Sequence, residues 1–324
     1  MKIGRWFDEN IPQEGWFAEV DGGWVAHPFQ DTTVMQLIES GLSAALEKLK
    51  LEQANPLPGK PLEKLRLRTP FDPKAVRDAV AFEQHVEGVV KSVDNSSGVV
   101  PQWYEFPTFY FTNPHTLIPT ETVMTPPPSE KLDFELEVGI VVGGVQDLSN
   151  LTPDEGEAAI FGLTMFNDWS ARDIQGREML VRLGPAKGKD FATTVGPWIV
   201  TADELESKKE AGFYHLMMQV EVNGKLIGRD SLANIGWPLG EIIAYASRNS
   251  IVKPGDLIGS GTSGGGGCLA ELWGRNGELT PSPLKPGDVV TMTVEGVGTI
   301  QNTVGQPVTA PAIPPARSGR RVNL

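Results

Sequence analysis

The chain has one cysteine, Cys268, among its 324 residues. A single cysteine cannot form a disulfide within the chain, and such scarcity is typical of proteins in a reducing compartment. The N-terminal segment lacks the apolar run of a signal peptide. No stretch approaches the roughly 18 apolar residues that a membrane span requires. These absences predict a soluble, cytoplasmic protein with no membrane partner.

Basic residues are also scarce. Lys and Arg number 28 against 41 Asp and Glu, which gives a formal net charge of −13. Nucleic-acid binding depends on clustered Lys and Arg, so this balance argues against a nucleic-acid partner. An anionic small molecule is not excluded, because a bound metal and a few local cations set the electrostatic field inside a cleft. The length permits one large domain or two unequal ones.

The N-terminal part predicts short strands over residues 1–30, with a turn at Asp21-Gly22-Gly23, and a helix over residues 31–53. A proline-rich linker follows. We therefore place a boundary near residue 70, between a small β/α domain (1–70) and a larger domain (71–324). A second helix is predicted over 73–91, because Asp72-Pro73 provides an N-cap and a first-turn proline.

The larger domain is predicted to be rich in strands from residue 131 onward. Asn223-Gly224 joins the clearest hairpin in the chain. Segments 256–260, 269–273 and 288–301 also alternate as strands do, while the proline-rich tail is expected to be extended. The glycine-rich segment GSGTSGGGGC is expected to be a flexible loop rather than a phosphate cradle. The predicted class is α+β, dominated by an antiparallel or mixed sheet system.

Two carboxylates, Glu135 and Glu137, stand two residues apart in the strand-like segment LDFELEVGIVVG. On a strand, side chains at i and i+2 point to the same face. Such close like charges call for a cation between them, and a divalent ion is the simplest one. Asp168, after another apolar run, would be a third carboxylate for Mg²⁺, Mn²⁺ or Ca²⁺. The alternatives are a solvated strand face for the glutamates and a helix cap for Asp168.

Three further polar residues follow Asp168. Arg172 and Gln175 share a helix face if a helix begins after Asp168, and Arg172 would pair with a carboxylate or a substrate anion, or else be exposed. Lys189 beside a metal would stabilise a developing oxyanion or carbanion. A surface lysine is the alternative.

His85 lies seven residues after Asp78, which is close to two turns, so both would face the same way on the helix predicted over 73–91. Histidine is a natural general base near neutrality, although a lone histidine is more often structural. We interpret His27, His115 and His215 as structural.

Taken together, four segments closely resemble the fumarylacetoacetate hydrolase family: LDFELEVGIVVG, FNDWSARDIQ, LGPAKGKDFATTVGPW and GSGTSGGG…LAEL. The resemblance runs from about residue 70 to the end of the chain. It implies an α+β, β-rich fold, the mixed β-sandwich roll of that family, with a small N-terminal domain, a homodimeric assembly and a divalent metal in the site.

The resemblance also implies a role for individual residues. The metal ligands would be Asp78, Glu135, Glu137 and Asp168. The general base would be His85 and its orienting acid Glu271. Contacts with substrate or support of the metal would come from Arg172, Gln175, Lys189, Tyr110 and Thr262.

The sequence departs from the family pattern at the distal end of the substrate. Where fumarylacetoacetases carry further tyrosines and an arginine, this chain has Val80, Met179 and Asp94. Three residues after His85 it has Gly88, where the acylpyruvase branch has a glutamate, which favours the pairing of His85 with Glu271. The resemblance therefore implies retained reaction machinery and changed distal recognition.

The predicted function is a metal-dependent hydrolase, with Mg²⁺ favoured, that cleaves a carbon–carbon bond in a fumarylacetoacetate- or acylpyruvate-like 1,3-diketo acid. The main alternative is a hydratase, decarboxylase or tautomerase of a 2-oxo acid on the same fold. A further alternative is a non-catalytic metal- or ligand-binding protein.

Overall fold

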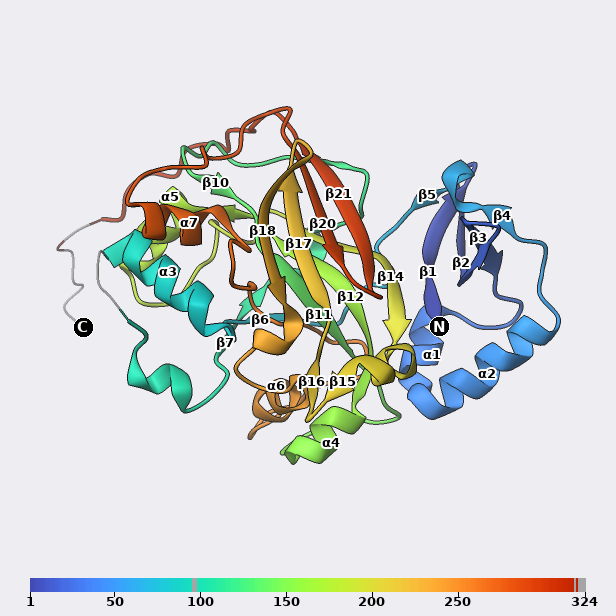
Figure 1. Ribbon diagram of the computed structural model, residues 1–324. Helices are drawn as coiled ribbons and strands as arrows, with labels where there is room; N and C mark the ends of the chain where they lie inside the picture. The colour runs from blue at the N-terminus through green and yellow to red at the C-terminus, as the bar shows by residue number, and fades with distance from the viewer. Residues whose placement is uncertain (95–97, 318, 320–324) are drawn as a thin grey trace.

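Two packed sheets form the body of the protein (Figure 1). The computed structural model describes residues 1–94, 98–317 and 319. Within these residues, the larger sheet has twelve strands. Ten follow in the order β4 (Lys60–Pro61), β3 (Gly23–Pro28), β2 (Ile11–Val20), β1 (Lys2–Asp8), β14 (Thr193–Thr201), β12 (Ile160–Asp168), β11 (Leu136–Val142), β19 (Leu257–Gly259), β6 (Val76–Ala79) and β7 (Phe109–Thr112). β5 (Arg66–Leu67) pairs with β1 and β8 (Leu117–Ile118) pairs with β14.

The remaining strands form a second sheet and two short pairs, and α-helices connect the strands. The second sheet runs β18 (Lys225–Ser231), β17 (Met217–Val222), β20 (Val289–Val294), β21 (Gly298–Val304), β9 (Val123–Met124). Two short pairs are β10 (Leu132–Asp133) with β13 (Ser170–Ala171), and β15 (Lys209–Glu210) with β16 (Phe213–Tyr214). The α-helices are α1 (Val34–Ser40), α2 (Leu42–Ala54), α3 (Glu83–Asp94), α4 (Pro153–Ala158), α5 (Arg172–Met179), α6 (Leu239–Ala246) and α7 (Leu269–Asn276). Among the described residues, none of the helices combines the length and the apolar character that a membrane span requires.

Strand β11 lies between two hydrophobic cores, because successive side chains on a strand point to opposite faces. Leu136, Val138 and Ile140 pack into the core shared with the second sheet. Val141 packs into the other core, on the opposite face. Glu137 alternates with the first set and therefore points away from the core between the sheets.

The N-terminal strands and helices lie at one end of the molecule (Figure 1). They are continuous with the rest of the fold, since β1 pairs antiparallel with β14, with Ile3 opposite Ile199. α1 and α2 pack Ile38 and Leu49 into the second core together with these two isoleucines. The domain boundary near residue 70 stays a prediction, and the large sheet extends on both sides of it.

The predicted helix over 31–53 is two helices. α1 begins with a capping box between Thr33 and Gln36. It ends at Gly41, whose φ of 76° lies in the region that glycine adopts most readily. α2 then starts at Leu42. The short strands predicted over 1–30 are confirmed as β1 to β3.

The predicted helix over 73–91 is wrong in its first half. Val76–Ala79 form β6, which pairs parallel with β19 and antiparallel with β7. The helix begins only at Glu83. Asp78 and His85 therefore lie on different elements and do not share a helix face. Pairing with strands distant in the sequence outweighs local helical preference here.

The predicted strand over 269–273 is also wrong, since this segment belongs to α7. The Cys268 sulfur caps the helix by accepting a hydrogen bond from the Glu271 N–H. The hairpin at Asn223-Gly224 is confirmed, with positive φ at both residues, as a tight hairpin turn requires. β19 lies within 256–260, and 288–301 contains β20 and most of β21. The glycine-rich segment before α7 is a loop, but most of it is buried.

A buried ion pair fixes β6 beside β19. Arg77 Nη1 lies 2.8 Å from Asp256 Oδ2, and the two side chains are 5% and 3% exposed. Removing one partner of a buried pair leaves an uncompensated charge. This pair therefore holds the strand that carries Asp78.

We expect Asp256→Ala to lower the free energy of unfolding by about 3–5 kcal/mol, because Arg77 would remain buried and unpaired. Denaturant unfolding would measure the loss. The matched control is Glu47→Ala, which breaks the exposed pair of Glu47 and Lys50 and should cost less than about 0.5 kcal/mol. Equal losses in the two variants would contradict the proposed role of the buried pair.

Candidate active site

Carboxylates from separate strands meet above a glycine in the large sheet. β19 pairs with both β6 and β11, so Asp78 lies opposite Gly259 and Gly259 lies opposite Gly139. A Cβ placed on Gly259 would be 2.4 Å from Asp78 Oδ1 and 2.8 Å from Glu137 Oε2. Only glycine leaves room for these two carboxylates to approach each other. Both side chains are buried.

A lysine joins two further carboxylates of the cluster. Lys189, in the loop between α5 and β14, places Nζ 2.7 Å from Asp168 Oδ2 and also bonds Glu135 Oε2. Asp168 is the last residue of β12, and Glu135 immediately precedes β11. All three side chains are buried. Lys189 is thus a buried cation of the site rather than a surface lysine.

Arg172 supports the same cluster from the first position of α5. Its Nη2 lies 2.8 Å from Glu135 Oε1 and 2.8 Å from Asp133 Oδ2. Its Nη1 donates to Gln175 Oε1 at 3.1 Å, which confirms that these two residues share a helix face. Arg172 therefore binds carboxylates of the protein in this structure and is not exposed.

The cluster carries more negative charge than these cations offset. Burial, together with the neighbouring carboxylates, raises the pKa values of Asp78 and Glu137 well above their usual range. Burial also raises the pKa of Asp168 to about 6, although Lys189 opposes the change. For Glu135 burial acts in the same direction, but Lys189 and Arg172 outweigh it and hold its pKa below the usual range. The remaining charge must be balanced by protons or by a cation.

The donors fit a hard divalent cation. Ligand atoms from Asp78, Glu135 and Asp168 all lie within 4.8 Å of one another. In the part of the chain that the structure describes, Asp78 Oδ1 and Asp168 Oδ1 are buried and have no hydrogen-bond partner. Carboxylate oxygens are the ligands that Mg²⁺, Mn²⁺ and Ca²⁺ prefer.

Glu137 is held from behind by the glycine-rich loop. Its Oε2 accepts from the Gly261 N–H at 3.0 Å, and its Oε1 accepts from Thr262 Oγ1 at 3.2 Å. Tyr110, on β7, approaches from the other side, and its hydroxyl donates to Asp168 and lies 3.2 Å from Asp78 Oδ2. The structure thus places Thr262 and Tyr110 against the carboxylates, while their contact with substrate stays a prediction.

A cavity of about 270 Å³ lies beside the cluster, lined by residues that include Tyr110, Ala186 and Lys189. A larger cavity of about 540 Å³ lies elsewhere, against Trp24 and Trp198. Since only the smaller cavity borders a residue of the cluster, it is the better candidate for substrate entry.

Comparison with known proteins gives the site its family context. A family model described as "Fumarylacetoacetate (FAA) hydrolase C-terminal" matches residues 74–305. The chain belongs to the fumarylacetoacetate hydrolase family. It is 34% identical over 249 residues to a fumarylacetoacetase from Arabidopsis thaliana, with 61% of this chain and 59% of that protein covered. The chain thus spans less than two thirds of the length of this curated relative.

Solved structures confirm the family fold. A 5-carboxymethyl-2-hydroxymuconate delta-isomerase from Mycobacterium smegmatis matches with a TM-score of 0.67 and 22% identity, covering 94% of this chain and 100% of the other. A maleylpyruvate hydrolase from Sphingobium sp. SYK-6, solved with manganese(II) and pyruvate, matches with a TM-score of 0.67 and 18% identity, covering 95% and 100%. The α+β, β-rich fold of the fumarylacetoacetate hydrolase type is therefore confirmed.

His85 lies on α3, close to the carboxylate cluster. Its Nδ1 is 3.6 Å from Cys268 Sγ. Burial lowers the pKa of His85 to about 4, so the imidazole is neutral near neutral pH. A neutral imidazole is the form that a general base requires.

Glu271, on α7, lies near α3 without bonding His85 in the described structure. Its Oε1 accepts from the Gly266 N–H at 3.2 Å and pairs with Arg275. Its Cγ would be 2.6 Å from a Cβ on Gly88, one helical turn beyond His85. Burial raises the pKa of Glu271 to about 7. The predicted pairing of Glu271 with His85 stays a prediction.

Sequence reasoning missed two residues of the site, Asp133 and Cys268. Asp133 binds Arg172 and also accepts from the N–H groups of Leu269 and Ala270, at 2.8 and 3.0 Å. Its signal was visible, because Asp133 precedes Glu135 by two residues in LDFELE. Cys268, the N-cap of α7, had no such signal besides being the sole cysteine.

Other residues named in the sequence analysis are not part of the carboxylate cluster. Val80 directly follows β6, and Met179 ends α5 with 45% of its surface exposed. The side chain of Asp94 lies outside the described residues. His27 stacks on Trp16, with ring centroids 4.3 Å apart.

We expect a divalent cation to raise the melting temperature more at neutral pH than near pH 5. The pKa of Asp168 is about 6 when folded and about 3.9 when unfolded. A raised folded pKa gives stability that is complete below the unfolded value and is lost as the pH rises through the folded value. Bound metal would offset the cost of burying ionised Asp168 at neutral pH. At lower pH it would first have to displace the proton of Asp168.

Thermal unfolding with Mg²⁺ or with EDTA at both pH values would measure this difference. The control is Asp168→Asn, which carries no ionisable group and should show a smaller gain from Mg²⁺ at neutral pH. A gain that is the same at both pH values in the unmodified protein would contradict the proposed linkage.

Proposed function

We propose that this protein is a metal-dependent hydrolase that cleaves a carbon–carbon bond in a 1,3-diketo acid. The observation that carries the proposal is the buried cluster of Asp78, Glu135 and Asp168 with Lys189 bonded to two of them. It combines the donors for a hard cation with a fixed positive charge. The family and its fumarylacetoacetase relatives support the same chemistry.

Asp78, Glu135 and Asp168 would hold the cation, with Glu137 as the fourth carboxylate. Mg²⁺ is the proposed ion, with Mn²⁺ or Ca²⁺ as substitutes, since all three prefer oxygen ligands. When bound, the ion would supply Lewis acidity and a template for the two oxygens of the enolised diketone. The maleylpyruvate hydrolase with manganese(II) and pyruvate supports a metal of this class.

Lys189 would stabilise negative charge that develops during the reaction. Burial acts against its charge, but Asp168 and Glu135 outweigh this effect and hold its pKa above the usual range. A cation fixed before the reaction stabilises an oxyanion or a departing enolate without reorganising. Gln175 would assist Lys189 in stabilising this charge. Arg172 Nη1 donates to Gln175 Oε1 at 3.1 Å and so orients its side chain.

His85 would act as the general base, with Glu271 as the acid that orients it. The imidazole takes a proton from water, the water oxygen bonds to the carbonyl carbon, and the carbon–carbon bond then breaks. The electron pair leaves as an enolate, which the proton held by His85 finally neutralises. Such a base contributes roughly 10²–10⁴-fold to the rate. Tyr110 and Thr262 would contact the substrate.

The assembly and the compartment form part of the proposal. We propose a homodimer, supported by the exposed apolar residues Leu180, Val181 and Leu183, which are 83%, 69% and 90% exposed after α5. The partners would be a small diketo or 2-oxo acid and a second copy of the chain. The single cysteine supports a cytoplasmic location.

A hydratase, decarboxylase or tautomerase of a 2-oxo acid is the second candidate. The observation that favours it is the arrangement of Glu271, which bonds Arg275 and, in the described structure, not His85. A hydratase would not need a base–acid pair that activates hydrolytic water. Dependence of turnover on both His85 and Glu271 therefore separates the two candidates.

The first test is loss of the ultraviolet diketo-enol absorbance across a panel of acylpyruvates and fumarylacetoacetate, with Mg²⁺ or Mn²⁺ and with EDTA. Metal-dependent loss for one member, with both cleavage products identified, would support the hydrolase. Absence of cleavage across the panel, with metal bound, would favour the second candidate.

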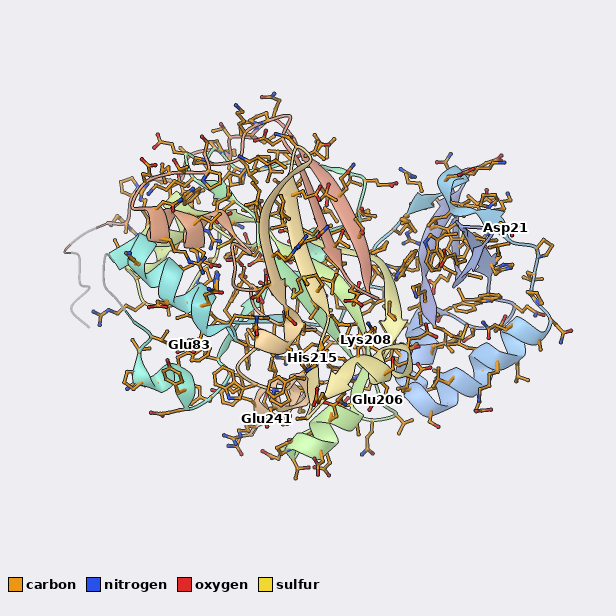
Figure 2. All side chains as sticks on the ribbon, in the orientation of Figure 1. Asp21, Glu83, Glu206, Lys208, His215 and Glu241 are labelled. Carbon is orange, nitrogen blue, oxygen red and sulfur yellow. The ribbon has the colours of Figure 1, made fainter. Side chains whose placement is uncertain are left out.

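We expect His85→Ala to reduce turnover by roughly 10²–10⁴-fold while metal binding through the carboxylates persists. His215→Ala is the matched control, since His215 is 55% exposed and pairs only with Glu210 in the described structure. Figure 2 labels His215, whose backbone N–H donates to the Lys208 carbonyl. Retained turnover in His85→Ala would overturn the assignment of the base.

We expect Glu135→Ala to raise the cation concentration required for half-maximal activity by about tenfold or more, because a ligand with two supporting cations is lost. Activity measured against Mg²⁺ concentration gives this value. Glu121→Ala, at an exposed residue outside the cluster, serves as the control. An unchanged cation requirement in Glu135→Ala would exclude Glu135 as a ligand.

A further inference from the structure

A second group of metal-ligating side chains lies next to the carboxylate cluster. Single ligand atoms of His85, Glu135 and Cys268 all lie within 4.8 Å of one another, and all three residues are buried. They come from α3, from the segment before β11 and from the N-cap of α7. The group offers nitrogen, oxygen and sulfur donors, whereas the carboxylate cluster offers oxygen alone.

The spacing of the two softer donors matches that of ligands on one zinc ion. Typical Zn–S and Zn–N bonds are about 2.3 Å and about 2.0–2.1 Å, and at a tetrahedral angle they place sulfur and nitrogen about 3.5 Å apart. His85 Nδ1 and Cys268 Sγ, which share a hydrogen bond in this structure, are 3.6 Å apart. The two side chains thus already stand at this separation.

We propose that His85, Glu135 and Cys268 form a second metal site, specific for a thiophilic divalent cation such as Zn²⁺. Imidazole and thiolate ligands favour Zn²⁺ over Mg²⁺, which keeps to oxygen. Three protein ligands leave a fourth position open for water or substrate. The thiol of Cys268 loses its proton to solvent when the metal–sulfur bond forms.

This site would regulate the enzyme, a consequence that rests on the proposed function. A cation held there engages the imidazole of His85, the proposed base, and one carboxylate of the hard-cation site, Glu135. Zn²⁺ would therefore inhibit the Mg²⁺-supported reaction. The negative charge of Asp133, which accepts from the Leu269 N–H next to Cys268, favours a cation nearby. Arg172 and Lys189, each bonded to one oxygen of Glu135, oppose it.

Binding can be tested without turnover, by titrating the purified 324-residue protein with Cd²⁺ and following the thiolate-to-cadmium charge-transfer absorbance. Cys268 is the only cysteine, so such a band reports on this residue alone. We expect one Cd²⁺ per chain, no band in Cys268→Ser, and affinity weakened about tenfold or more in His85→Ala and in Glu135→Gln. His215→Ala should leave the affinity unchanged.

Two results would overturn the proposal: no band in the unmodified protein, or a band whose affinity is the same in His85→Ala and in the unmodified protein. Circular dichroism checks that each variant folds, and His85→Gln replaces His85→Ala if the latter does not. Because the band needs no substrate, failure of the hydrolase assay and failure of this site are separate outcomes. If the hydrolase is active, Zn²⁺ should inhibit it about tenfold less strongly in Cys268→Ser.

Discussion

Burial of several carboxylates at one point is the constraint on which the rest of the structure depends. The charge of buried Glu135 is offset most directly, because Lys189 bonds one of its oxygens and Arg172 bonds the other. Each of these cations reaches a second carboxylate, Asp168 or Asp133. An isolated buried charge would be too costly to keep. α5 and the loop before β14 place these two cations against the cluster.

The close approach of strands around a glycine sets the geometry of the same carboxylate cluster. β19 has only three residues, yet it places Gly259 between β6 and β11, where any side chain would collide with Asp78 and Glu137. Gly88 plays a comparable part between α3 and α7, because Glu271 occupies the space of its missing Cβ. At Gly259 the missing side chain lets two carboxylates approach each other, and at Gly88 it lets α7 pack closely against α3.

Local patterns predicted the parts of the site that depend on nearby residues. The alternation in LDFELE and the three-residue spacing of Arg172 and Gln175 are properties of one strand and one helix. β6 could not be identified in this way, because its pairing with β19 joins Asp78 to a residue about 180 positions away. The apolar pattern of LAELW fits strand and helix alike, and the cap by Cys268 that decides for a helix is a contact of the folded state.

The pairing of β1 with β14 also matters for whether residues 71–324 could fold by themselves. Without the first 70 residues, β14 would keep only its short parallel pairing with β8 on that side, over Thr193 and Thr194. The backbone groups of Ile199 and Val200 would then form an open sheet edge, flanked by apolar side chains from both cores. Such edges template association with other chains. The N-terminal segment therefore covers a stretch of β14 that would otherwise be an open edge of the large sheet.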